Sequence, residues 1–173
     1  MVPILETARL RLRAFRESDL DAQARMLGDP DFMRYLGGKT LTREDSWRRL
    51  LSGAGLWSIL GYGYWGVERR DDGTFIGQVG FADFKRDMTP SIEGIPEMGW
   101  VLAPETHGQG FASEAVAAAL DWARQALRGR EIVAIIDPAN TPSIRGAEKA
   151  GFAAREEALY RADPILLFRR APE

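Results

Sequence analysis

The sequence contains no cysteine and only one histidine, His107. Without cysteine there can be no disulfide framework, thiolate metal site or cysteine nucleophile. A single histidine excludes a multi-histidine metal site, so no bound metal is predicted. No Gly-x-Ser-x-Gly elbow accompanies His107, which argues against a serine hydrolase. Any thiol chemistry would therefore come from a cofactor.

The sequence also lacks a long apolar run and an excess of positive charge. No uninterrupted apolar stretch approaches the roughly 18 residues that a membrane-spanning helix needs, and no basic segment followed by an apolar core stands at the amino terminus. The formal net charge is −2 at pH 7, whereas proteins that bind nucleic acid usually carry a basic surface. We therefore expect a cytoplasmic protein that binds neither membrane nor nucleic acid.

The length and composition fit one domain over residues 1–173. The chain has 45% hydrophobic and 28% charged residues, a balance typical of globular proteins. A chain of this length can bury a core of its own. No linker, internal repeat or low-complexity tract divides it.

Local patterns alternate between strand and helix signals. Leu10, Leu12 and Ala14 alternate with arginines, which predicts a strand with a solvated arginine face and leaves a phosphate-binding patch as the alternative. Residues 85–94 are polar and predict a flexible loop. Further strands are expected over residues 64–69, 75–81, 95–102, 132–136, 153–159 and 165–168. Helices are expected after Ser18 or Asp19, after Thr42, over 111–127, and from the cap Thr141 to Gly151.

The most informative segment is a glycine turn between an expected strand and an expected helix. It reads His107-Gly108-Gln109-Gly110-Phe111-Ala112, so several main-chain N–H groups can converge on an anion such as a pyrophosphate. A tight connection without a ligand is the alternative. A dinucleotide-binding fold is disfavoured, because Ser113 occupies its third glycine position and the turn lies past the middle of the chain.

The turn and the segment after the next strand resemble the GNAT superfamily of acetyl-coenzyme A-dependent N-acetyltransferases. The family turn reads Gln/Arg-x-x-Gly-x-Gly/Ala. In this sequence His107 stands at the first position, and Gly110 and Ala112 match the rest. Asn140 and Ser143 stand at matching places after the next strand.

The opening of the chain, residues 5–13 followed by residues 16–19, resembles the RimJ/RimL-like branch, which includes ribosomal-protein N-terminal acetyltransferases. The resemblance implies an α/β (α+β) fold with a mixed, largely antiparallel central sheet of six or seven strands, flanked by about four helices. Two middle strands would part in a V. Acetyl-coenzyme A would be the cosubstrate, and its pantetheine arm would enter the V.

The same resemblance implies where the coenzyme is held. Main-chain amides of the glycine turn would bind its diphosphate, helped by the helix dipole, and His107 would contact a phosphate or simply pack. A main-chain N–H of the preceding strand would bind the thioester oxygen, and Asn140 would bond the pantetheine arm. The expected cofactor-binding residues are Trp100, Val101, Leu102, His107, Gly108, Gln109, Gly110, Phe111, Ala112, Ser113 and Asn140.

Acetyl transfer to an amine requires a neutral amine, a stabilised oxyanion and a proton for the departing thiolate. Glu97, on the strand before the turn, could draw the amine proton directly or through water. The alternative for Glu97 is a salt bridge to an acceptor cation or to a neighbouring arginine. Many family members carry a tyrosine one helical turn after the serine position. Here Ala147 stands there, so Ser143 or water would return the proton.

The expected activity is transfer of an acetyl group from acetyl-coenzyme A to a primary amine by direct attack in a ternary complex. The acceptor could be a peptide amino terminus or a small molecule such as a polyamine, an amino acid or an antibiotic. A catalytically inactive module that binds acyl-coenzyme A for regulation is the alternative from another class. A homodimer is an open alternative for assembly.

Overall fold

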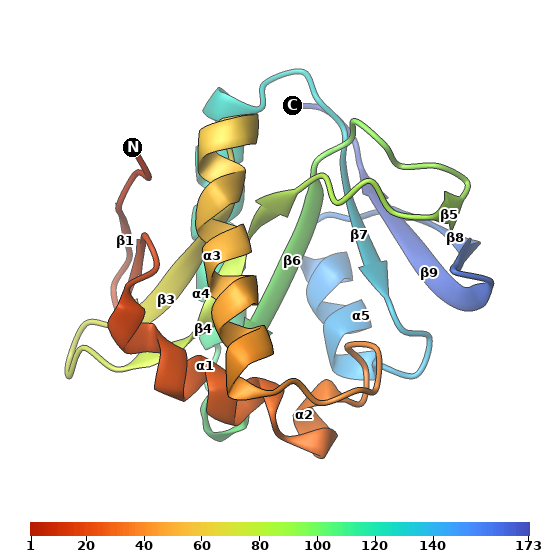
Figure 1. Ribbon diagram of the computed structural model, residues 1–173. Helices are drawn as coiled ribbons and strands as arrows, with labels where there is room; N and C mark the ends of the chain where they lie inside the picture. The colour runs from red at the N-terminus through yellow and green to blue at the C-terminus, as the bar shows by residue number, and fades with distance from the viewer.

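The computed structural model describes residues 1–173, and its centre is one nine-stranded sheet (Figure 1). The strands lie in the order β1-β2-β3-β4-β6-β7-β9-β8-β5. They span Leu5–Glu6 (β1), Leu10–Arg13 (β2), Tyr64–Arg69 (β3), Phe75–Ala82 (β4), Met88–Thr89 (β5), Glu97–Leu102 (β6), Ile132–Ile136 (β7), Ala154–Tyr160 (β8) and Asp163–Arg170 (β9).

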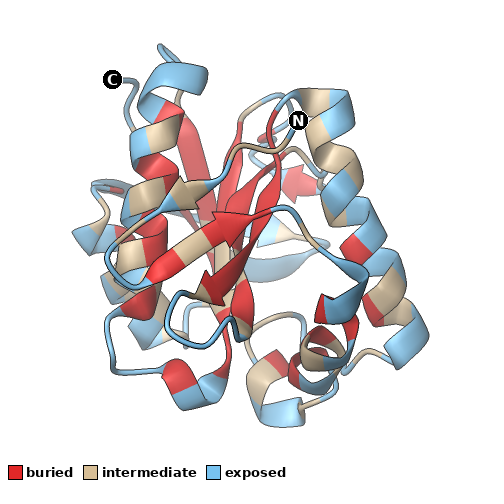
Figure 2. Cartoon of the chain, turned by 90° about the vertical axis from the view of Figure 1, so that its left-hand side faces the viewer, coloured by how far each residue is buried: buried red, intermediate tan, exposed pale blue.

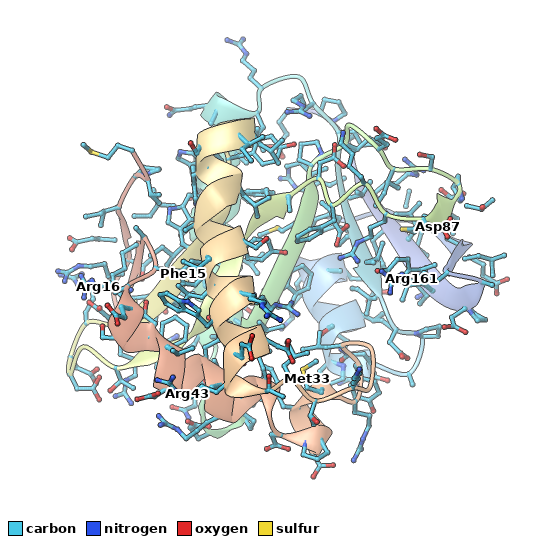
Figure 3. The ribbon with its side chains drawn as sticks, viewed as in Figure 1. Phe15, Arg16, Met33, Arg43, Asp87 and Arg161 are labelled. Carbon is cyan, nitrogen blue, oxygen red and sulfur yellow. The ribbon has the colours of Figure 1, made fainter.

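The sheet exceeds the six or seven strands expected because a short strand pairs at each edge. β1 and β5 contain two residues each, and the other seven strands account for the expected number. β5 lies within residues 85–94, and its pairing with β8 through Met88 and Tyr160 orders this segment. Figure 3 shows Asp87 and Arg161 side by side there, and the Arg161 N–H donates to the Asp87 carbonyl at 3.0 Å. The prediction of a flexible loop is therefore wrong around β5.

Five α-helices and two short 3-10 turns accompany the sheet. The helices are α1 (Leu20–Leu27), α2 (Pro30–Met33), α3 (Arg43–Leu60), α4 (Phe111–Ala126) and α5 (Thr141–Lys149), and the turns are Glu17–Asp19 and Pro104–Thr106. About four helices were expected, and the single turn of α2 is the fifth. In Figure 1, α3 lies in front of the sheet and α4 behind it.

The expected V is present between β6 and β7. All other strand pairs are antiparallel, whereas β6 and β7 are parallel and pair at one position only, Glu97 opposite Val133. β6 pairs with β4 over its whole length, and β7 pairs with β9 over its whole length. Two half-sheets therefore meet near Glu97 and separate toward the carboxyl ends of β6 and β7, where Figure 1 shows α5.

The main core packs α4 and α5 against the same face of the sheet. It joins strand residues such as Trp65 and Phe81 to Ala119 of α4 and Ala147 of α5, all almost fully buried. The Trp65 and Trp122 rings meet edge to face, with centroids 5.1 Å apart. Figure 2 shows the buried strands inside and the exposed outer faces of the helices. The core thus fixes α4, and with it the glycine turn, relative to β6.

The arginines of β2 do not form one solvated face as predicted. The Arg13 side chain is only 4% exposed and donates to both oxygens of Asp19 at 2.8 Å and to Glu68 at 2.5 Å. Period-two alternation marked Arg13 as exposed, but the Glu17–Asp19 turn folds back over this position and supplies a buried carboxylate. Arg13 therefore ties β2 to β3 and to the start of α1.

Candidate functional site

The glycine turn lies directly after β6, at the open end of the split between β6 and β7. β6 ends at Leu102, a short 3-10 turn follows, and residues 107–110 lead into α4. Gly108 and Gly110 have φ values of +74° and +80°, a left-handed conformation that residues with a Cβ adopt at a cost. These two glycines allow the chain to reverse and start α4 within a few residues.

The turn presents a row of free main-chain donors. The six consecutive N–H groups from Gly108 to Ser113 have no hydrogen-bond acceptor in the structure. The first turn of any α-helix leaves donors unpaired, but side chains cap α2, α3 and α5 through Asp29, Thr42 and Asn140. α4 has Gly110 at this position and no side-chain cap. Its amino end is therefore open to an anion, which the helix dipole also favours.

Side chains of the turn hold the turn itself. His107 Nε2 lies 2.9 Å from the Leu102 carbonyl, and Gln109 Nε2 donates to the Glu105 carbonyl at 2.9 Å. Phe111 is buried with its ring in the core. His107 is exposed and bonds the main chain of the turn, and Phe111 can offer an anion only its main-chain N–H.

The three expected donors on β6 do not face the same way. The Ala103 N–H donates to the Ile76 carbonyl of β4, and main-chain groups alternate in direction along a strand. The Val101 N–H therefore faces β4, whereas the N–H groups of Trp100 and Leu102 face the split. The Pro96 carbonyl accepts the Val133 N–H of β7. Pro96, Trp100 and Leu102 are separated by even numbers of residues, so their main-chain groups all face the β7 side.

On the opposite side of the split, α5 brings together the two expected residues that follow β7. Asn140 rather than Thr141 is the helix cap, because its side-chain oxygen accepts the Ser143 N–H at 3.3 Å. Ser143 is partly exposed. Ala147 is fully buried, so no side chain there reaches the split. The Trp100 indole lies against the same helix, 3.8 Å from where a Cβ on Gly146 would be.

Glu97 lies at the closed end of the split and is almost fully buried. Both of its oxygens accept from Arg86, Oε2 from Nε at 2.6 Å and Oε1 from Nη2 at 2.8 Å. Arg86 in turn lies over the rings of Phe84 and Tyr160, 4.8 and 4.9 Å from their centroids. The structure thus contains the neighbouring-arginine salt bridge that was the alternative to base catalysis.

Burial and charge around this ion pair also affect Tyr64 on β3. Burial, followed by the nearby Glu97 charge, raises the pKa of Tyr64 well above its usual value. A Cβ on Gly99 would lie 2.2 Å from the Tyr64 hydroxyl, so the phenol packs directly against β6. Tyr64 is therefore a neutral hydroxyl beside Glu97, in a place that the sequence did not indicate.

Sequence reasoning missed three residues at the turn, namely Thr7, Arg9 and Glu114. Glu114 lies in the first helical turn of α4 and binds the side chains of Thr7 and Arg9, while Arg9 also donates to the Gln109 carbonyl. The signals were the likeness of residues 5–13 to a family segment and the phosphate-binding alternative for the alternating arginines, and neither of them indicates contact with the turn. A surface hollow of about 780 Å³ lies beside residues 4–7 and α4, whereas the site at the split is identified by its free main-chain donors.

Comparisons with known proteins show the family of this chain. Residues 9–153 match the family model of the acetyltransferase (GNAT) domain. The Bacillus subtilis (strain 168) protein YkkB is 33% identical over 178 residues, with 96% of this chain and 94% of YkkB covered. YoaA of the same organism, called an uncharacterized N-acetyltransferase, is 31% identical, with 88% and 84% covered.

Solved structures show the same fold. An acetyltransferase from Agrobacterium tumefaciens str. C58 superposes with a TM-score of 0.78 at 26% identity, covering 98% of this chain and 94% of that one. RimL, a ribosomal L7/L12 alpha-N-protein acetyltransferase solved with coenzyme A, superposes with a TM-score of 0.77 at 18% identity, covering 98% of both chains. At that identity the likeness to RimL concerns the fold.

No cluster of three or more histidine, aspartate or glutamate side chains is arranged to hold a metal ion. None of the helices combines the length and apolar character that crossing a bilayer requires.

Proposed function

The chain belongs to the GNAT acetyltransferase family, and from this premise we propose that it transfers an acetyl group from acetyl-coenzyme A to a primary amine. The observation that carries the proposal is the row of six free N–H groups at the uncapped start of α4, at the open end of the split. When bound, the coenzyme supplies an activated acetyl thioester. A diphosphate fits these donors because it offers several anionic oxygens to converging N–H groups.

The residues around the split have distinct roles in this proposal. The N–H groups from Gly108 to Ser113 bind the diphosphate, and the N–H groups of Trp100 and Leu102 face the position of the thioester oxygen. Such preorganised main-chain donors stabilise negative charge that develops during acyl transfer. Asn140 caps α5 and holds Ser143 at the edge of the split, where Ser143 or water would return a proton to the thiolate.

The amine must lose its proton before it attacks, and Glu97 is the carboxylate nearest the closed end of the split. Arg86 holds both oxygens of Glu97, and the lone pairs that remain on the carboxylate are the sites that can accept that proton, directly or from a water molecule. A route through water is therefore open beside the direct one.

A panel of amines assayed for release of free coenzyme A thiol tests the activity. It includes short peptides with free amino termini, spermidine, amino acids and an aminoglycoside, each with its acetylated form as control. We expect release with at least one free amine and with none of the acetylated forms. A peptide amino terminus is the first acceptor to test, because RimL is a protein amino-terminal acetyltransferase with the same fold. Binding without any turnover would contradict the proposal.

Replacing Glu97 by glutamine tests its role in proton removal. The amide keeps the shape and a hydrogen-bond acceptor for Arg86 but cannot accept a proton. We expect kcat to fall roughly tenfold, less than the ~10²–10⁴ of a freely positioned base, because Arg86 already occupies the carboxylate. Steady-state kinetics and coenzyme A titration would measure this, and the coenzyme dissociation constant should not change. The Glu93→Gln variant, which alters an exposed acid in the segment between β5 and β6, is the matched control.

A regulatory module that binds acyl-coenzyme A without catalysis is the second candidate. Two features favour this candidate. Glu97, the expected base, is engaged in an ion pair with Arg86, and Ala147 stands where a tyrosine could donate a proton. A module of this kind should be stabilised by about 2.7 kcal/mol at a coenzyme concentration of 100 times the dissociation constant, yet release no thiol with any amine. Thermal unfolding with coenzyme A, run beside the amine panel, separates the two candidates.

A further inference from the structure

The amino end of α4 carries a carboxylate in its first turn, at Glu114. A negative charge there competes with a bound anion for the positive end of the helix dipole and for the free N–H groups. An acidic residue at this position is therefore unfavourable for a diphosphate site unless its charge is compensated. The structure shows what compensates it.

Both oxygens of Glu114 are bound by the segment that precedes β2. Oε1 accepts the Thr7 hydroxyl at 2.5 Å and the Arg9 N–H at 2.9 Å, and Oε2 accepts Arg9 Nε at 2.7 Å. Burial alone would favour the neutral acid, but these hydrogen bonds and the Arg9 charge lower the pKa of Glu114. Glu114 is therefore ionised, neutralised by Arg9 and turned toward residues 7–9.

Arg9 also holds the main chain of the glycine turn. Its Nη1 donates to the Gln109 carbonyl at 2.8 Å, its guanidinium lies 4.3 Å from the Phe111 ring centroid, and its Nη2 lies 3.3 Å from where a Cβ on Gly110 would be. A peptide unit is planar and trans, so its C=O and N–H point in opposite directions. Fixing the Gln109 carbonyl toward Arg9 therefore points the Gly110 N–H away from Arg9.

The segment that carries Arg9 is itself held in place. Thr7 Oγ1 accepts the Leu10 N–H at 2.9 Å, and the Thr7 N–H donates to the Leu10 carbonyl at 2.9 Å. Arg70 Nη1 donates to the Thr7 carbonyl at 2.5 Å. Residues 7–10 thus form a closed turn joined to β3, and Arg9 reaches from it to α4 in a defined geometry.

We propose that Arg9 is a positioning residue of the coenzyme site, which orients the Gln109–Gly110 peptide and neutralises Glu114 so that the amino end of α4 can accept a diphosphate. This inference rests on the proposed coenzyme site. It adds to that site Arg9, which lies 100 positions before Gln109 in the sequence. Arg9 does not touch the reacting atoms. Its effect should therefore fall on coenzyme affinity and leave the acetyl transfer step unchanged.

The variants Arg9→Ala, Arg9→Lys and Arg9→Ala/Glu114→Gln test the two parts of the proposal. For Arg9→Ala we expect KM for acetyl-coenzyme A and the inhibition constant of inorganic pyrophosphate to rise about tenfold, with kcat unchanged at saturation. Arg9→Lys should be intermediate, because an ammonium can pair with Glu114 but lacks the fork that also reaches Gln109. The double variant should recover part of the lost affinity, because it removes the uncompensated charge.

An acetyl donor without the diphosphate shows whether the loss of Arg9 acts through diphosphate binding. S-acetylpantetheine lacks the diphosphate, so its kcat/KM should be the same for the wild type and for Arg9→Ala. The matched control is Arg124→Ala, which removes an ion-paired arginine at the other end of α4 and should leave all these constants unchanged. Thermal unfolding of each variant shows whether the fold is retained.

Several results would overturn the inference. One is an Arg9→Ala variant that folds and binds acetyl-coenzyme A and pyrophosphate as the wild type does. Another is an equal loss with S-acetylpantetheine, which would assign Arg9 a general structural role. A double variant no better than Arg9→Ala would refute the neutralisation of Glu114. Failure of the wild type itself to bind coenzyme A would instead refute the proposed function, so the two failures are distinguishable.

Discussion

Replacing Arg13 by methionine should destabilise the fold by about 3–5 kcal/mol, the usual cost of removing one partner from a buried ion pair. The Arg13 side chain is 4% exposed and bonds Asp19 and Glu68, whose side chains are 3% and 6% exposed. Methionine fills a similar volume but leaves two buried carboxylates without their central cation. Urea denaturation should show a lower transition midpoint at an unchanged m value.

A matched control separates burial from charge. Arg16 also pairs with Glu68, but its side chain is 56% exposed, so Arg16→Ala should cost no more than about 1 kcal/mol. The triple variant Arg13→Met/Asp19→Asn/Glu68→Gln should be more stable than Arg13→Met, because it removes the two buried negative charges that the single variant leaves without Arg13. If Arg13→Met cost no more than Arg16→Ala, the network would be peripheral to stability.

The burial of Arg13 also shows where pattern reasoning on the sequence stops. Alternation of apolar residues with arginines correctly places β2, because side chains in a strand alternate between two faces. It assigns all three arginines to solvent because alternation carries no information on what covers a face. Asp19 supplies that cover from a turn whose position depends on how α1 packs.

The features of the site likewise divide into those that the sequence could predict and those that it could not. The glycine turn could be predicted because left-handed glycines before a helix are a local property of the chain, visible at Gly108 and Gly110. The split at Glu97 followed from resemblance to a family and from nothing local. The partner of Glu114 could not be predicted, since Arg9 meets it across 105 positions. A neighbouring arginine was an expected alternative for Glu97, but the sequence did not identify it as Arg86. Such contacts exist only once the sheet has formed.

Replacing Ser113 by glutamate should change stability and coenzyme affinity in opposite directions. Ser113 is exposed in the first turn of α4, where its main-chain N–H is free. A carboxylate there interacts favourably with the helix dipole and with the unpaired donors, so the free protein should gain about 0.3–1 kcal/mol. The same carboxylate occupies and repels the diphosphate position, so the coenzyme A dissociation constant should rise about 100-fold, or ~2.7 kcal/mol. Denaturant unfolding and calorimetric titration would measure the two effects.

Two controls separate the position of the new charge from the charge itself. Ser113→Gln adds a side chain of the same length without charge and should weaken binding far less. Ala117→Glu adds the same charge at an exposed site one helical turn further along α4, where the influence of the helix terminus has fallen off, so its coenzyme affinity should stay near that of the wild type. A loss with Ala117→Glu as large as that with Ser113→Glu would mean that net charge alone decides affinity. Unchanged affinity with Ser113→Glu would place the diphosphate elsewhere, because an anion held by these N–H groups cannot share them with a carboxylate.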